Sequence, residues 1–280
     1  MDYDDVSIGV ALSGGATRGM AHIGALKALH DNGIHADMIA GTSIGALVAA
    51  LYAFGIPIEE MYEHAVELNW LKVSSFSLSR TGLLSNKPIG EMVERFIGDA
   101  DISQASIPLA IVTTDIATGE KVVLREGNVA TAVMASTCVP GIFKPVELND
   151  RLLVDGYLLE NVPVTPLKEM GADVIISVNL SARKRYRIPD GIFDIVLNAF
   201  DIAVDANVRR GLPISDVVIE PDLFSILDSE TANPAVAFFD EGYTATMARL
   251  QAIKSMLTKK HREKKHPVWH KVKNWLSTSM

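Results

Sequence analysis

The sequence predicts an α/β fold in which helices cover a mostly parallel sheet. Short apolar runs of strand length alternate with longer segments of helical periodicity, which is the pattern of consecutive strand–helix–strand units. With 280 residues, 48% of them hydrophobic, the chain is long enough to bury one substantial core. No internal repeat or low-complexity tract interrupts the alternation. We therefore expect one domain over residues 1–257, followed by a tail over residues 258–280.

The alternation begins at the amino end of the chain. Strands are predicted at 6–12 and 38–40, and helices at 17–32 and 44–54. Later apolar runs, each too short for a helix, are predicted as buried strands at 109–113, 122–124, 152–154, 174–178 and 217–219. Further helices are predicted at 88–97, 129–136, 192–209 and 235–257. The Ser-rich stretch 71–85 lacks periodicity and is predicted as a long loop or cap, for which a lid role is left open.

Charge is distributed unevenly along the chain. The net charge is −8, but residues 254–273 hold eight Lys or Arg against one acid, so this segment carries +7 and the remainder −15. An acidic body disfavours nucleic acid as a partner, since binding to the phosphate backbone relies on a broad basic face. The single cysteine, Cys138, excludes an internal disulfide and a zinc site with several thiolates.

The location of the protein is predicted from two absences in the sequence. The opening Met-Asp-Tyr-Asp-Asp does not have the pattern of a secretory signal, and no run approaches the roughly 18 apolar residues of a membrane-spanning helix. We therefore expect a cytoplasmic protein. The tail, 258–280, mixes basic residues with apolar residues at helical spacing. It is predicted either to contact the anionic inner membrane surface peripherally or to pack on the body or a second subunit.

A nucleophile elbow is predicted at Gly41-Thr42-Ser43-Ile44-Gly45, between a short strand and an Ala-rich helix. A serine on so sharp a turn has strained backbone angles, and Gly41 and Gly45 would let strand and helix approach closely. The helix that begins at Ile44 would point free N–H groups and its positive dipole end at the site. Ser43 is therefore the candidate nucleophile, and the alternative is a helix N-cap.

A glycine-rich turn at 14–19 lies at the preceding strand-to-helix junction. Its small residues expose backbone N–H groups at a helix start, which suits a phosphate or a transient oxyanion. Both phosphate interpretations fail on spacing, because Met20-Ala21 stands where a P-loop needs Lys-Ser/Thr, and the glycines do not follow G-x-G-x-x-G. An oxyanion hole for a serine on the neighbouring turn fits both loops. The predicted N–H donors are Gly14, Gly15, Ala16 and Ile44.

The base that activates Ser43 is predicted to be a carboxylate. No histidine occurs between residues 65 and 260, and the later ones lie in the basic tail, which argues against a Ser-Asp-His triad. Asp155 is the best candidate, because it follows the apolar run 152–154 and precedes Gly156, where a loop leaves the sheet. The alternative for Asp155 is a turn residue at the strand end. Arg18 is expected to brace its own loop.

Together these elements resemble the signature motifs of patatin-like phospholipases. The glycine run at 14–19, Gly-Thr-Ser-Ile-Gly at 41–45 and Asp-Gly at 155–156 match the family's motifs in order and separation. The segment 135–146 is similar to the one that precedes the family's catalytic Asp, and the resemblance spans about residues 6–180. Two positions depart from the family pattern: Ala16 stands where glycine is usual, and Tyr157 where a second small residue is usual.

The resemblance is to the short, single-domain bacterial type, and it implies a three-layer α/β/α sandwich, a Ser43–Asp155 dyad, no metal and no other cofactor. It implies hydrolysis of fatty acyl esters, so we expect a phospholipase- or lysophospholipase-like serine esterase with a lipid substrate. Supporting roles are expected for Arg18, Gly41, Gly45 and Gly156. The alternative is a non-catalytic regulatory module on the same fold that binds a lipid or a protein. A nucleotide-binding enzyme is disfavoured by the missing phosphate lysine.

Overall fold

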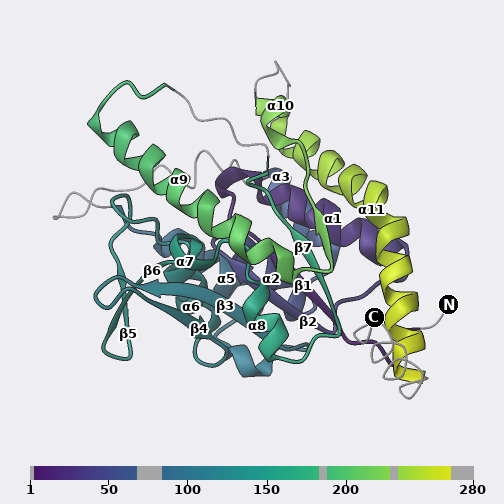
Figure 1. Ribbon diagram of the computed structural model, residues 1–280. Helices are drawn as coiled ribbons and strands as arrows, with labels where there is room; N and C mark the ends of the chain where they lie inside the picture. The colour runs from purple at the N-terminus through teal and green to yellow at the C-terminus, as the bar shows by residue number, and fades with distance from the viewer. Residues whose placement is uncertain (1–2, 68–83, 183–187, 228–232, 266–280) are drawn as a thin grey trace, which may run out of the picture.

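The computed structural model describes residues 3–67, 84–182, 188–227 and 233–265, and it confirms the three-layer α/β/α prediction. An eight-stranded sheet lies between two layers of helices (Figure 1). The strand pairing runs β5-β6-β3-β2-β1-β7-β8, and β4 also pairs with β3. The loop predicted at 71–85 falls outside the described residues except for its last two positions.

The parallel part of the sheet forms the centre of the molecule. Its strands are β1 (Ile8–Leu12), β2 (Met38–Thr42), β3 (Leu109–Asp115), β7 (Val174–Val178) and β8 (Val217–Ile219). The first four are buried along their whole length, which explains their continuous apolar sequences. Alternate side chains enter two separate cores, since Val10 and Leu12 join the larger cluster whereas Ala11 joins the smaller one.

Helices cover both faces of this sheet (Figure 1). The larger core lies under α1 (Met20–Asp31), α2 (Ile44–Ala53), α3 (Ile58–Glu67), α5 (Lys87–Ile97), α6 (Val129–Ser136) and α11 (Pro234–Lys265). The smaller core lies under α7 (Tyr157–Glu160), α8 (Val164–Glu169) and α9 (Ile192–Gly211). The short helix α10 (Leu223–Leu227) packs on α11. Single 3₁₀ turns occur at Ala16–Gly19, Ile102–Gln104 and Leu212–Ile214.

Three antiparallel strands extend the sheet beyond β3: β4 (Glu120–Leu124), β5 (Val146–Leu148) and β6 (Arg151–Asp155). β4 pairs with residues 111–115 of β3, so it occupies one edge of that strand. The opposite edge is shared, because β2 pairs with residues 109–112 and β6 with residues 113–115. β2 and β6 therefore run toward each other along a single edge of β3, and their carboxyl ends meet there.

Every strand and helix predicted from the sequence is present, with ends displaced by a few residues at most except at α11. α11 continues across position 257 to Lys265, past the point where its apolar periodicity weakens, because residues 258–265 are mostly Lys, Arg and Glu, which favour helix. The sequence did not predict α3, β5, α7, α8 or α10. Most of these are shorter than the windows on which periodicity depends.

The described part of the tail, residues 258–265, packs on the body of the protein. His261 and Lys264 contact Asp5, and Lys264 also forms an ion pair with Asp173. Asp5 precedes β1 and Asp173 precedes β7, so this end of α11 lies at the amino ends of the parallel strands. No helix among the described residues is long and apolar enough to span a membrane. A cytoplasmic location and a membrane contact through 258–280 stay predictions.

Candidate active site

The meeting point of β2 and β6 brings Ser43 and Asp155 together. Thr42, the last residue of β2, pairs with Val112, and Asp155, the last residue of β6, pairs with the next residue, Thr113. Ser43 and Asp155 are both buried, with exposed fractions of 8% and 1%. The Ser43 hydroxyl lies close enough to the Asp155 carboxyl to lower the pKa of that carboxyl. Two residues 112 positions apart are thus juxtaposed by strand register.

The backbone around Ser43 has the geometry of a nucleophile elbow. Ser43 has φ 56° and ψ −126°, a strained conformation for a residue with a side chain. A Cβ atom on Gly41 would lie 2.3 Å from the carbonyl oxygen of Gly45, and one on Gly45 would lie 2.2 Å from the carbonyl oxygen of Leu12. Both glycines are therefore required by close backbone approach between β2, α2 and β1.

Ser136, the last residue of α6, fills the gap between the two strand ends. Its hydroxyl accepts a hydrogen bond from the N–H of Ser43 at 2.8 Å and donates to the carbonyl of Val112 at 2.7 Å. The N–H of Asp155 donates to the carbonyl of Cys138 at 2.9 Å. A Cβ atom on Gly156 would lie 2.3 Å from the Val112 carbonyl oxygen, so glycine is required there as well. The backbone of each candidate catalytic residue is thus fixed by the segment 136–138.

The environment of Asp155 suits a base that works near neutral pH. Burial raises the pKa of Asp155 to about 7, although hydrogen bonds from the Ser43 hydroxyl and the Tyr157 N–H act in the opposite direction. The Tyr157 N–H donates to Oδ1 of Asp155 at 2.9 Å, which fixes the carboxylate plane. The side chain of Tyr157, the second departure from the family pattern, packs against the smaller core.

The glycine turn at 14–19 lies directly against the elbow. A Cβ atom on Gly14 would lie 3.2 Å from Cβ of Ser43, and one on Gly19 would lie 2.3 Å from Cγ1 of Ile44. Ser13 anchors the turn to β7, because its hydroxyl accepts the N–H of Leu180 at 2.9 Å and donates to the Gly14 carbonyl at 3.0 Å. The turn is therefore held in place beside Ser43 by contacts from several elements.

Of the four predicted oxyanion donors, Gly14 is engaged elsewhere. Its N–H donates to Oδ1 of Asn161 at 2.9 Å and to the Asn161 carbonyl at 3.2 Å, so it is removed from the donor set. The N–H groups of Gly15, Ala16 and Ile44 donate to no acceptor recorded among the described residues. Ala16 has φ 50°, a left-handed conformation that favours glycine. The replacement of the family's usual glycine therefore leaves strain in this turn.

Arg18 contacts the turn from within its own loop. Its Nε donates to the Gly15 carbonyl at 2.8 Å, and its guanidinium donates to the Leu180 carbonyl at 3.1 Å and lies 4.6 Å from the ring centre of Phe224. Burial lowers the pKa of Arg18 to about 10, an effect that Asp201 and Asp205 partly offset, so it stays charged at neutral pH. These contacts are those of a bracing residue.

His22 is the histidine nearest in sequence to the turn, and its environment excludes it as a base. It is fully buried, and its Nε2 lies 2.7 Å from the Ser13 carbonyl, to which it must donate a proton because a carbonyl can only accept. Burial lowers the pKa of His22 to about 4, so the ring is neutral at physiological pH. His22 therefore supports the backbone of the glycine turn.

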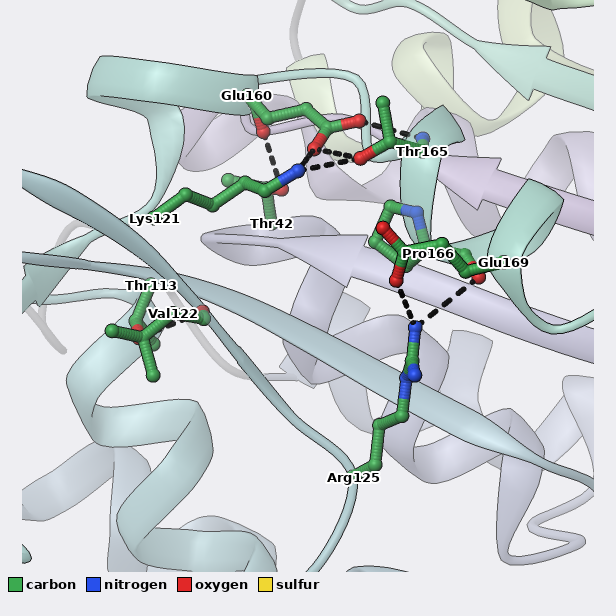
Figure 2. A network of polar contacts seen from close by, with 9 residues as sticks. All are labelled: Thr42, Thr113, Lys121, Val122, Arg125, Glu160, Thr165, Pro166 and Glu169. Carbon is green, nitrogen blue, oxygen red and sulfur yellow. Dashed lines mark hydrogen bonds and ion pairs between the residues drawn. The ribbon is translucent and has the colours of Figure 1, made fainter.

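A network on the α7–α8 side ties the elbow to the rest of the sheet (Figure 2). The Thr42 hydroxyl donates to the Glu160 carbonyl at 2.9 Å. The Glu160 carboxylate accepts from Lys121 at 2.6 Å and from the N–H of Thr165 at 2.7 Å. A second cation, Arg125, contacts Glu169 at 2.7 Å. The residue before Ser43 is thus connected, through α7 and α8, to β4.

Sequence reasoning missed Asn161, Ser136 and the anchoring role of Ser13. All three are almost completely buried polar side chains, with exposed fractions of 3%, 0% and 0%. A buried polar group must find partners, but the sequence does not tell which of its many Ser and Asn residues are buried. The usable signal was closeness in sequence to the predicted site residues, since Asn161 follows Asp155 by six residues and Ser13 adjoins the glycine run.

The structure is a three-layer α/β/α sandwich with a serine on a strand–turn–helix elbow beside a glycine turn. The family model for patatin-like phospholipases matches residues 10–168, which is more than half of the chain. The chain belongs to the patatin-like phospholipase family, as the sequence motifs predicted.

Curated relatives carry the name of the NTE family. An uncharacterized NTE family protein of Mycobacterium tuberculosis is 35% identical over 177 residues, which cover 62% of this chain and 49% of that protein. Another from the same organism is 28% identical over 278 residues, covering 88% of this chain and 47% of the relative. Lysophospholipase NTE1 of Yarrowia lipolytica is 29% identical over 182 residues, covering 63% of this chain and 13% of the relative. The chain thus spans about half the length of the mycobacterial relatives, or less.

Solved structures share the fold at low sequence identity. VipD from Legionella pneumophila superposes with a TM-score of 0.53 at 15% identity, covering 90% of this chain and 67% of that chain. A chain of the ExoU–SpcU complex from the type III secretion system of Pseudomonas aeruginosa gives a TM-score of 0.51 at 15% identity, covering 90% and 52%. These similarities support the architecture alone.

We predict that Asn161→Ala destabilises the protein by about 1–3 kcal/mol, because the buried Gly14 N–H keeps only its longer bond to a main-chain carbonyl. Ser181→Ala is the matched control, since it removes the 3.1 Å bond from the other end of the Asn161 amide and leaves the Gly14 contact in place. Urea unfolding measures both. Equal losses for the two variants would show that the Gly14 contact contributes nothing.

We predict that Ala16→Gly stabilises the protein by about 0.5–1 kcal/mol, because glycine adopts a positive φ without the steric cost of a Cβ atom. Ala252→Gly, at an exposed position inside α11, should instead destabilise by about 1 kcal/mol. Chemical denaturation of both variants checks the opposite signs. A loss of stability in both would mean that the turn carries no strain at Ala16.

Proposed function

We propose that this chain is a serine acyl-ester hydrolase of the phospholipase or lysophospholipase type, with Ser43 as nucleophile and Asp155 as its base. The proposal is carried by the strand register that places Ser43 beside a buried carboxyl whose pKa burial raises to about 7. A base is most effective when its pKa is close to the working pH. Membership of the patatin-like family and a relative named as a lysophospholipase support lipid hydrolysis as the reaction class.

In the first step, Oγ of Ser43 bonds to the ester carbonyl carbon while its proton moves to Asp155. The carbonyl oxygen becomes an oxyanion, for which the N–H groups of Gly15, Ala16 and Ile44 are the proposed donors. Collapse of this intermediate breaks the ester bond, and the departing alcohol takes the proton from Asp155. Water then attacks the acyl-enzyme and gives a proton to Asp155. The bond between the acyl carbon and Oγ of Ser43 breaks, Oγ takes the proton back from Asp155, and the carboxylic acid leaves.

A small apolar cavity lies close to the elbow. The cavity begins at Gly19, whose Cα lies against Ile44 of the elbow, and extends among α1, α2, α3 and α5. Apart from Gly19 and His64, its lining residues are apolar: Ile23, Leu47, Val48, Leu51, Met61, Ala65, Met92 and Phe96. Since the cavity has a volume of only about 20 Å³, a fatty acyl chain would enter it only if the lining side chains moved apart.

We predict that Ser43→Ala lowers ester turnover at least a thousandfold and abolishes labelling by a fluorophosphonate probe, since no other side chain at the site can form the acyl-enzyme. A panel of short-chain esters, lysophospholipids and thioesters measures turnover, and gel fluorescence measures labelling. Ser255→Ala, an exposed serine on α11 at the far end of the molecule, is the control and should behave as wild type. Wild-type labelling of Ser43→Ala would remove Ser43 from the mechanism, and an inert wild type would favour a non-catalytic module.

We predict that turnover rises with pH through about pH 7, because Asp155 must be ionised to accept a proton and burial holds its pKa there. The same pKa shift predicts a stability effect. The folded carboxyl binds protons more tightly than the unfolded one, so its contribution to stability falls as the pH rises from about 4 to about 7.

The variant Asp155→Asn tests both parts of this pH prediction. It should lose turnover at every pH, and its melting temperature should exceed that of the wild type by more at about pH 8 than at about pH 5, since only the wild type then buries a charge. A pH-independent difference in melting temperature, or an activity that tracks a pKa near 4, would contradict the assignment of Asp155.

A further inference from the structure

Helix α9 presents an apolar face to solvent. Its exposed positions, among those whose side chains are described between 192 and 208, are all apolar: Ile192, Ile195, Ala199, Phe200, Ile202, Ala203 and Ala206. Ile192, Ile195 and Ile202 have exposed fractions of 79%, 52% and 55%, and Ile188, just before the helix, is 95% exposed. A helix of a soluble domain normally turns such a stripe inward. The pattern of α9 is therefore the reverse of the usual one.

The polar residues of α9 lie toward the protein. Asn207 donates to the Leu158 carbonyl of α7 at 3.1 Å. Asp201 and Asp205 are half-buried and close enough to Arg18 to raise its pKa. Val204 and Val208, on the same side of the helix, enter the smaller core. The helix is thus anchored through this mixed inner side, and its outer stripe has no partner among the described residues that would bury it.

This apolar stripe lies beside the candidate active site. α9 packs on α7, the helix that directly follows Asp155 (Figure 1). Asp201 also faces Tyr157, whose N–H holds the Asp155 carboxylate. Of the nine exposed large hydrophobic side chains among the described residues, five are on α9 or just before it, and a sixth, Leu159, is on α7. The exposed apolar surface is therefore concentrated on α9 and α7, next to Asp155.

The chemistry of the stripe favours hydrocarbon as its partner. Residues 188–208 contain no Lys or Arg, although basic residues flank them at 183–187 and 209–210, so the stripe itself carries no charge that would attract anionic headgroups. From 192 to 206 the exposed side chains also offer no hydrogen-bond donor or acceptor, whereas protein interfaces carry polar groups that pair across them. Acyl chains require neither charge nor hydrogen bonds. A helix that lies in the membrane interface with its apolar side among the acyl chains needs neither charge nor hydrogen-bonding groups on that side.

We propose that the outer face of α9, formed by Ile188, Ile192, Ile195 and Ile202, docks on an uncharged or zwitterionic lipid surface and so brings Ser43 to its substrate. The proposal rests on the proposed function in one respect only, the identity of the substrate. It assigns attachment to apolar insertion beside the site, and not to the basic residues of α11, which lie at the amino ends of the strands.

The test compares the triple variant Ile192→Gln, Ile195→Gln, Ile202→Gln with the wild type. These positions are exposed and glutamine favours helix, so the fold should be retained, which circular dichroism and thermal unfolding check. Met247→Gln is the matched control, since Met247 is 39% exposed on α11. Flotation with phosphatidylcholine vesicles measures binding at low and high salt, with and without added phosphatidylglycerol. Turnover is measured on a soluble short-chain ester and on a vesicle-bound ester.

We expect the wild type and Met247→Gln to bind phosphatidylcholine vesicles independently of salt, without a gain from phosphatidylglycerol. The triple variant should bind at least about tenfold more weakly and lose a similar factor on the vesicle ester, with soluble-ester turnover unchanged. Vesicle binding that is unchanged in the triple variant overturns the proposal, as does binding that depends on phosphatidylglycerol and low salt. A wild-type dimer that the triple variant converts to monomers overturns it too, because the face would then be a subunit interface.

These assays distinguish a wrong hydrolase assignment from a wrong docking surface. If the wild type hydrolyses neither ester but the triple variant still loses vesicle binding, the docking surface stands and the hydrolase assignment falls. If the triple variant loses turnover on both esters, α9 supports the site from within and the docking surface is overturned.

Discussion

The geometry of the site depends on one constraint of the sheet, the shared edge of β3. β4 occupies the other edge, so β2 and β6 compete for the same side and can only lie end to end. Their last residues are then paired with consecutive positions of β3. This register places Ser43, which follows β2, beside Asp155, which ends β6. Ser136 satisfies the backbone groups left open between the two ends. The glycines at 41, 45 and 156 follow from the same crowding.

In the proposed mechanism, burial gives Asp155 the basicity that a histidine supplies in a triad. An exposed aspartate is too weak a base near pH 7, and a histidine would solve this with its intrinsic pKa. Here, desolvation moves the carboxyl into the same range, and no cation is recorded against it among the described residues to reverse the shift. Arg18, the cation of the glycine turn, is held by carbonyls and Phe224, and Asp201 and Asp205 of α9 raise its pKa. The acidic side of α9 thus balances the charge of Arg18.

The sequence predicted most of the fold, because strongly apolar strands such as β1 and β7 and the periodic helices can be recognised locally. It located Asp155 at a strand end, but for an incomplete reason: β6 is antiparallel, and its end reaches Ser43 through the register with β3, which no local pattern contains. It listed Gly14 as an oxyanion donor because glycine turns expose N–H groups, yet Asn161 takes that group from a distance of 147 residues. Long-range partners of single polar groups are the information that local patterns lack.

The contact between α1 and α11 has a consequence for biosynthesis. A Cβ atom on Gly24 would lie 2.0 Å from the Phe239 carbonyl oxygen, and one on Gly242 would lie 2.1 Å from the Ala21 carbonyl oxygen, so the two helix backbones touch on either side of His22. His22 in turn holds the Ser13 carbonyl at the start of the glycine turn. During translation the turn leaves the ribosome more than 200 residues before the helix that secures it. A nascent chain that ends before α11 therefore has a glycine turn without the helix contacts on either side of His22.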